Sequence, residues 1–431
     1  MRHSWTPRRS ARAAVVLTSL LVASPRSAHA REAPPAPAPV APASGARRFG
    51  FVSQDGADAI AIHWLVQSDY TTFLTDKPPG VTSRDTFTIG FAGLQLDAQL
   101  ASIFHSSVLA DFSQSRLTLL DAFIDARFAK ELTVRVGKFP TPLNAERLTP
   151  RILLPWIGTG VASMLIPVRE LGVQLLGDLG DGVFQYNAAV VNGSWAGTIS
   201  DNDPDSSKDV ITRVFLHPFK KSGVEPLEKL GIGVGASFGR RFGTPAAPET
   251  LVLRTYGNAT FFAYPNDGTP TGSVLANGDV TRLAPHFTYA WGPLAGFADY
   301  VHEVDHFGTT AVKSDAFGAT ASVALTGEDA SPFARISVRR PWNPRLGHLG
   351  GVQLVVGGGY VHVSDAAFNP GLAVPAVAMQ QATIVGGGIN WYLIDRVGIL
   401  LDYSHATFQS FGGAPMRPAE DTLYSRLEFH M

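Results

Sequence analysis

The 431-residue chain contains no Cys, and 16% of its residues are charged, with 35 Lys and Arg against 36 Asp and Glu. The absence of Cys excludes a disulfide framework and thiol chemistry, and the charge balance disfavours nucleic-acid binding, which needs a basic face. Beyond residue 30 no run approaches the roughly 18 apolar residues of a membrane helix, so any membrane span must be made of strands that close into a barrel.

The N-terminus has the three parts of a secretory signal peptide. A basic start with Arg8 and Arg12 precedes an apolar run at residues 13–23, and residues 28–30 are Ala-His-Ala. A buried N-terminal helix would need these features to coincide by chance, and a lipoprotein would need a Cys at the cleavage point. We expect cleavage after Ala30, which removes five Arg and leaves a net charge of 30 − 36 = −6.

Residues 31–44, REAPPAPAPVAPAS, are dominated by proline. Proline lacks the amide donor of a regular element and favours extended polyproline conformation. The sequence therefore predicts a periplasmic lead-in without activity over residues 31–50, followed by a barrel over residues 51–431.

From residue 58 onward the hydrophobic pattern has a period of two and recurs in short segments separated by turn-rich stretches. In residues 120–128 the apolar side chains occupy every second position, while Asp121, Asp125 and Arg127 share the other face. One face suits lipid and the other suits water. The same alternation occurs at residues 60–67, 132–136, 184–190 and 334–338, where Ala334, Ile336 and Val338 oppose Arg335, Ser337 and Arg339.

A soluble β-sandwich also alternates, so the pattern alone does not choose the fold. The signal peptide, the lack of Cys, the long polar loops and aromatic residues near expected strand ends favour the barrel; these are Trp291, Trp342, Trp391 and Tyr392. We count about 16 to 18 strands, a range usual for channel-forming barrels. A last strand over residues 421–431 places Leu423, Leu427 and Phe429 on one face.

One stretch of the chain resembles the phosphate-selective porin O and P family over roughly residues 84–219. The resemblance rests on motifs in the family's order: LDAFIDAR at 120–127, LTVRVGKFPTP at 132–142, ERL at 146–148, PVRELGVQL at 167–175, NG at 192–193 and KDVITR at 208–213. It implies an antiparallel transmembrane barrel of 16 strands in the outer membrane of a Gram-negative-type bacterium. It also implies a homotrimer and a long loop that folds inward and narrows the pore.

The candidate for that constriction loop is the segment at residues 140–168, which is too rich in Pro for a regular element. Arg offers a fork of donors suited to phosphate or carboxylate, and a narrow passage amplifies the field of such charges. The candidate pore-lining and anion-binding residues are Arg147, Arg151 and Arg169 of this loop and its exit, with Arg127, Arg135, Lys138 and Arg213 on lumen-facing strand positions. The alternative is that several of them pair with Asp121, Asp125 or Glu170 and brace the wall.

These observations predict a porin that lets small solutes diffuse through a water-filled channel in outer-membrane lipid, with a tilt toward small anions such as phosphate. A selectivity for phosphate is weakly supported, because the chain has only eight Lys. Adjacent basic residues of a strand also point to opposite faces, so a pair such as Arg339-Arg340 places at most one in the pore. We expect no cofactor, metal or nucleic-acid partner.

Three enzyme-like motifs were weighed against this prediction. Residues 302–306, HEVDH, match a zinc-protease motif that requires a helix, yet their neighbours predict a strand. Residues 235–239, GASFG, match a nucleophile elbow but lead into a turn rather than a helix. The acidic loop at residues 201–205 lacks the Gly and final Glu of a calcium-binding loop. The alternative functions were an outer-membrane enzyme or a secreted β-sandwich binding protein.

Overall fold

The computed structural model describes residues 49–113, 117–199, 201, 203 and 205–431. The expected signal peptide and most of the expected lead-in lie outside the described residues. The first described strand, β1 (Phe49–Val52), begins within the stretch expected as lead-in.

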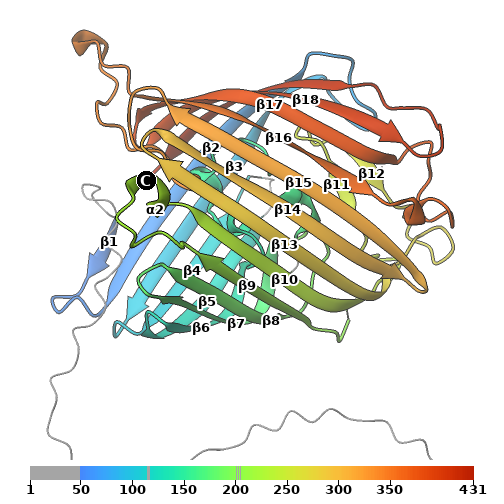
Figure 1. The fold of residues 1–431 in the computed structure, drawn as a ribbon, viewed down its shortest axis with the longest axis horizontal. Coiled ribbons are helices and arrows are strands. Elements are labelled where there is room, and N and C mark those ends of the chain that lie inside the picture. The colour runs from blue at the N-terminus through green and yellow to red at the C-terminus, as the bar shows by residue number, and fades with distance from the viewer. Residues whose placement is uncertain (1–48, 114–116, 200, 202, 204) are drawn as a thin grey trace, which may run out of the picture. The chain divides into compact units, whose positions relative to one another are not determined.

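An antiparallel sheet of sixteen strands closes on itself, because its first strand pairs with its last (Figure 1). This confirms the barrel and the lower end of the expected strand count. The strands are β2 (Ala59–Phe73), β3 (Asp85–Leu100), β4 (Phe104–Asp111), β5 (Thr118–Ala129), β6 (Leu132–Pro140), β7 (Arg169–Leu179), β8 (Phe184–Val191), β9 (Asp209–Leu216), β10 (Gly231–Phe242), β13 (Asn277–Trp291), β14 (Leu294–Phe307), β15 (Thr310–Ala324), β16 (Gly351–Val363), β17 (Met379–Ile394), β18 (Val397–Ser410) and β19 (Glu420–His430).

Both ends of the described chain complete the barrel at one edge of β2. The last strand, β19, pairs with residues 65–73 of β2, and β1 pairs with residues 59–62 of the same strand. Trp64 and Met431 exchange two backbone hydrogen bonds of 3.0 Å where the two partners meet. The expected terminal strand is therefore confirmed, and it leaves no long unpaired edge on β2.

The two faces of the barrel differ as the period-two pattern predicts. On β5, Ile124 and Phe128 are 58% and 67% exposed, whereas the intervening Asp125 is 1% exposed. On β13, Leu283 and Phe287 are exposed, while Arg282 faces the interior and is buried. Large apolar side chains turned outward from a closed sheet face lipid, and the polar face lines the lumen.

The two ends of the barrel differ in the length of their connections. Turns at residues 101–103, 130–131, 292–293 and 395–396 join strands at one end, whereas the other end carries the long loops at residues 141–168, 192–208, 243–276 and 364–378. Short turns are periplasmic and long loops extracellular in outer-membrane barrels. Two longer connections break the rule at the short-turn end: residues 217–230, which include α2 (Glu225–Glu228), and residues 325–350. No described helix is long and apolar enough to cross a membrane.

The hydrophobic core lies inside the barrel, where inward-folded loops pack on the wall. Leu143, Leu165 and Ile166 of the 141–168 loop are fully buried. The 243–276 loop, with its two short strands β11 (Val252–Arg254) and β12 (Thr260–Ala263), adds Leu253, Phe261 and Phe262 to the same cluster. These side chains stabilise the loops by removing apolar surface from the water of the lumen.

The expected strand at residues 334–338 is wrong. These residues lie in the connection between β15 and β16 and have no ladder partner, apart from an isolated bridge between Ser331 and Ala334. The alternation is real, because Ile336 and Val338 are buried, but they pack on inward-facing Tyr392, Leu400 and Tyr424 rather than on lipid. Prolines at 332, 341 and 344 lack the donors of a ladder and explain why this apolar face is not a strand.

Gly235 allows the 141–168 loop to pass over β10. A Cβ placed at Gly235 would lie 1.9 Å from the Leu143 carbonyl oxygen, whereas a Cβ at Gly318 would lie 3.4 Å from the nearest loop atom, Ala162 N. The first distance is a clash with backbone and the second is an ordinary contact. The close approach of the loop to β10 therefore depends on Gly235, the first glycine of the GASFG motif.

We predict that Gly235→Ala displaces the start of the 141–168 loop and lowers stability by about 1–3 kcal/mol, the usual cost of overpacking. Thermal unfolding of the refolded barrel and single-channel conductance measure the two effects. Gly318→Ala is the matched control and is expected to leave both unchanged. Equal behaviour of the two variants would contradict the contact between Leu143 and β10.

Candidate functional site

The loop at residues 141–168 enters the lumen as a chain of short turns. It contains α1 (Ala145–Leu148) and the 3-10 helices η1 (Arg151–Leu153) and η2 (Ala162–Leu165). Asn144 caps α1, since its side chain accepts a hydrogen bond from Arg147 N at 2.9 Å. Prolines at 150, 155 and 167 prevent these turns from joining into one helix.

Three inward-facing side chains of the wall hold the loop by its backbone. Asp402 Oδ2 accepts from Ile157 N at 2.8 Å, and Asn390 Nδ2 donates to the Pro155 carbonyl at 2.9 Å. On the other side of the loop, Arg282 Nε donates to the Leu165 carbonyl at 3.0 Å. Because all three side chains are buried, these bonds compete little with water and fix the height of the loop in the barrel.

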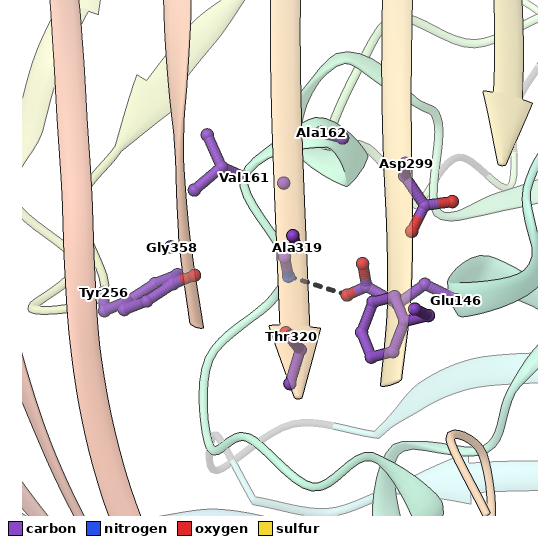
Figure 2. Close-up of a pocket in the computed structure, with 11 residues that line it drawn as sticks. Glu146, Val161, Ala162, Tyr256, Asp299, Ala319, Thr320 and Gly358 are labelled. Carbon is purple, nitrogen blue, oxygen red and sulfur yellow. Dashed lines mark hydrogen bonds between the residues drawn. The ribbon is translucent and has the colours of Figure 1, made fainter. Parts of the chain in front are cut away.

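Glu146 braces the loop internally. Its carboxylate accepts from Gly160 N at 2.7 Å and from Ser163 Oγ at 2.8 Å, and so ties α1 to η2. Figure 2 shows this carboxylate beside Asp299 of β14, in a small cavity between the loop and the wall. Asp299 is buried, and its Oδ1 has no partner among the described residues.

Arg147 acts on the loop rather than on the open lumen. Its guanidinium donates to the carbonyl oxygens of Ser163 and Ile166, the latter at 3.1 Å. Burial lowers the pKa of Arg147 to about 10, against the favourable charge of Glu146, so it remains protonated at neutral pH. Its charge therefore serves to close the loop on itself.

Arg151 differs from the other basic residue of the loop because its side chain is exposed. The surrounding barrel lowers its pKa to about 10, together with repulsion from Arg426, while Asp69 and Asp111 oppose the shift. It makes no ion pair with any residue in the described part of the chain. Arg151 is thus a wetted cation inside the barrel, charged at neutral pH.

The charged residues that act on Arg151 are already engaged with other partners. Arg426 binds Asp69 in a bidentate pair with both distances at 2.7 Å. Asp111 accepts from the backbone amides of Ala92 and Ser113 at 3.1 Å and 2.9 Å. The formal charges of Arg151, Arg426, Asp69 and Asp111 sum to zero, but the guanidinium of Arg151 is the one left free to meet a passing ion.

Four of the other predicted residues form ion pairs on the wall. Arg135 binds Asp125 through two hydrogen bonds of 2.7 Å and 3.0 Å, and Arg127 lies 3.5 Å from the same carboxylate. Arg169 Nε donates to Asp121 Oδ1 at 2.6 Å, and Lys138 pairs with Asp201. Glu170, the third acid considered, instead accepts from Ser194. The geometry here matches the bracing alternative, although Arg127 remains partly exposed.

Arg213 is buried on β9, and no carboxylate of the described residues forms an ion pair with it. Its Nε donates to His286 Nε2 at 3.2 Å, and its guanidinium lies 4.9 Å from the centre of the Phe215 ring. A neutral partner and an aromatic face leave most of its charge uncompensated. Arg213 therefore adds positive potential to the wall.

Sequence reasoning missed several charge pairs of the wall. Arg241 binds Asp209 with two bonds of 2.9 Å, and Arg282 binds Glu303 at 2.6 Å. Glu303 belongs to the HEVDH motif, which lies on strand β14 as expected. His302 lies on the opposite face, where it contacts Asp315 at 2.7 Å. Period-two alternation could have placed Glu303 inside, but no local signal identifies its partner.

The acidic loop at residues 201–205 contributes single carboxylates to separate partners. Asp201 pairs with Lys138, Asp203 lies 2.6 Å from Lys208, and Asp205 accepts from Phe242 N at 3.1 Å. Among the residues that the structure describes, no group of three His, Asp or Glu side chains converges in a way that could hold a metal ion.

The model of the phosphate-selective porin O and P family matches residues 92–429. The chain belongs to this family. It is an outer-membrane channel of a Gram-negative-type bacterium, and the family match extends the earlier resemblance to the C-terminal half of the barrel. A comparison with curated proteins finds no match.

Solved porin structures share the fold at low sequence identity. OmpT of Vibrio cholerae superposes with a TM-score of 0.55 and 11% identity, over 88% of this chain and 100% of that one. DcaP, an outer-membrane channel of Acinetobacter baumannii, gives 0.55 and 13% over 88% and 99%. An anion-selective porin from Comamonas acidovorans gives 0.51 and 10% over 87% and 100%. At these identities the likeness shows the fold alone.

The 243–276 loop of the porin packs against the 141–168 loop. The rings of Tyr256 and Trp156 meet edge-on with centres 6.0 Å apart, and Thr255 Oγ1 donates to Glu420 Oε1 at 2.5 Å. Near the start of this loop, Glu249 is buried and its Oε2 has no partner among the described residues. Burial, with repulsion from Asp205, raises the pKa of Glu249 to about 7, although Arg241 opposes the shift.

At the periplasmic end, residues 330–338 also enter the barrel of the porin. Arg335 Nη1 lies 3.2 Å from Glu428 Oε1 and 3.0 Å from His430 Nδ1, and its guanidinium covers the Tyr392 ring at 4.4 Å. Val338 N donates to Asp395 Oδ1 at 2.8 Å. Loop segments that start from both ends of the barrel thus pack inside it.

We predict that Asp402→Ala frees residues 155–157 from the wall, because Ile157 N loses its buried acceptor at a cost of about 1–3 kcal/mol. Single-channel recording should show a higher conductance and more open-channel noise. Asp402→Asn, whose side-chain oxygen can still accept this bond, is expected to stay close to the unmodified porin. A quiet channel of unchanged conductance in the alanine variant would contradict the attachment.

We predict that docking of the 243–276 loop weakens as the pH rises from 5 to 8. The folded state holds a proton on Glu249 that the unfolded chain releases above its ordinary value of 4.5, so stability falls with pH across this window. Glu249→Gln should flatten the change in thermal midpoint, whereas Asp267→Asn, an exposed acid of the same loop, should not. An unchanged slope in the glutamine variant would exclude Glu249 as its source.

Proposed function

We propose that the porin passes small solutes by passive diffusion and favours small anions through Arg151. The observation that carries this proposal is the exposure of Arg151 inside the barrel, where the acids that act on it, Asp69 and Asp111, are already bound to Arg426 or to backbone amides. A free cation at a narrow, wetted point attracts anions and repels cations.

The net charge of −6 expected for the mature chain acts in the other direction. Selectivity depends on the local field at the narrowest point more than on total charge, which salt screens within about 8 Å at physiological ionic strength. Asp125, Asp121, Asp209 and Glu303 are each compensated by an arginine within 3 Å. Their compensation supports a weak anion preference rather than a strict selectivity for phosphate, for which a denser basic path would be needed.

A trimeric form is described for OmpT of Vibrio cholerae, which supports a homotrimer for this porin. We propose that residues 1–30 are a signal peptide, that the chain from residue 31 to the start of β1 is a periplasmic lead-in, and that residues 140–168 are the constriction loop of the barrel. The position of Glu303 and His302 on opposite faces of β14 supports a channel without proteolytic activity.

We predict that Arg151→Gln moves the reversal potential in a salt gradient toward cation preference, because it removes the free positive charge without touching an attachment of the loop. Arg240→Gln, which removes an exposed arginine paired with Asp279 at 3.8 Å near the extracellular rim, is the matched control. It should leave the reversal potential unchanged. If the two variants behave alike, anion preference originates elsewhere on the wall.

Arg147→Gln separates the two roles of the loop arginines. Because Arg147 binds the Ser163 and Ile166 carbonyls, its loss should alter conductance and thermal stability more than ion preference. A large shift in reversal potential for this variant, with none for Arg151→Gln, would assign selectivity to the buried arginine and overturn the proposal.

A further inference from the structure

The second half of the connection between β15 and β16 turns away from the lumen. After Val338, residues 339–349 are mostly exposed and include the 3-10 helix η3 (Pro344–Leu346). Three large apolar side chains are unusually open here: Trp342, Leu346 and Leu349 are 46%, 66% and 65% exposed. An exposed cluster of this kind marks an interaction site.

This tip is continuous with the lipid-facing surface of the barrel. Trp391, on the outward face of β17, donates its indole N–H to the Leu349 carbonyl at 2.6 Å. Trp342 N donates to the Leu393 carbonyl at 2.7 Å. These bonds hold the tip beside the outer face of the wall at its periplasmic end, where aromatic side chains of membrane proteins meet lipid headgroups.

A basic hollow of about 390 Å³ lies within the same tip. Arg339, Arg340 and His348 line it together with the backbone of Gly347 and Gly350. Arg340 is exposed and forms no ion pair within the described residues, and Arg345 is exposed on the adjoining helix.

Three arginines of this tip (Arg339, Arg340 and Arg345) outnumber the two nearby acids, Glu328 and Asp329, so the formal charge of the tip is +1. Glu328 lines the hollow but is buried and accepts from Thr326 Oγ1. Asp329 lies 3.5 Å from Arg339, with both side chains largely exposed, so this contact is weak. Arginine forks bind phosphate in two-point geometry, and Arg340 is free to do so.

We propose that this tip, at residues 339–350, binds an anionic phospholipid of the periplasmic leaflet. The phosphate headgroup occupies the hollow beside Arg339 and Arg340, and the acyl chains follow Leu346, Leu349 and Trp391 onto the outer wall. The connection between β15 and β16 then has two roles. Residues 330–338 fill part of the lumen, and the tip at residues 339–350 anchors them to the membrane.

Lipid retention tests the headgroup site. Native mass spectrometry of the refolded, full-length porin in detergent with added phosphatidylglycerol should show one retained lipid per chain, and the double variant Arg339→Gln/Arg340→Gln should weaken retention roughly fivefold for each arginine removed. Arg240→Gln, at the other end of the barrel, is the control and should retain lipid normally. Equal retention in all three proteins would overturn the proposal. Inorganic phosphate that displaces the lipid at low millimolar concentration would instead assign the hollow to a soluble anion.

The depth of residue 346 in the bilayer tests whether the apolar side chains of the tip enter the membrane. Because the chain has no Cys, Leu346→Cys can carry a single nitrobenzoxadiazole label, with Leu74→Cys on an extracellular loop as the control. In nanodiscs that contain phosphatidylglycerol, lipid-borne spin labels at the headgroup should quench the label at 346 several-fold more than the label at 74. Strong quenching at 346 by aqueous iodide, with none by the lipid quencher, would place the tip in water and overturn the anchor.

Discussion

The structure depends on one constraint: inside a bilayer, every backbone amide and carbonyl must find a partner within the protein. A sheet meets this requirement only when it closes, and closure here is completed by the pairing of β19 with β2 and by the short β1 that continues the same edge. Closing the sheet creates a lumen, and the lumen then has to be shaped. The other features of the molecule are consequences of that need.

Where a loop in the lumen packs against the wall, its backbone loses contact with water and must bond to side chains of the wall. Asp402, Asn390 and Arg282 supply those bonds for the 141–168 loop, and Gly235 supplies the space. A larger side chain in place of Gly235 would clash with the loop. Apolar side chains in place of Asp402, Asn390 and Arg282 would leave backbone groups of the loop without hydrogen-bond partners. The inner wall is therefore polar for two reasons, as the lining of a channel and as the support of the loops that pack inside it.

Charge on the wall is divided between bracing and permeation. A bidentate pair such as Arg135 with Asp125 stiffens neighbouring strands but presents little net charge to a passing ion. Arg151, which has no such partner among the described residues, contributes a field that a solute can meet. The number of basic residues in the sequence is consequently a poor measure of selectivity, because carboxylates offset the charge of many of them.

The sequence by itself determined the fold class. Its period-two pattern follows from the pleat of a strand, so the two faces of β5, β14 and β19 and the long loop after β6 could be predicted from local composition. It could not determine which charges pair, because partners such as Arg426 and Asp69 are 357 residues apart and meet only after the barrel closes with one register. For the same reason residues 334–338 were misassigned: their alternation is local, but whether an apolar face meets lipid or the lumen is decided by tertiary packing.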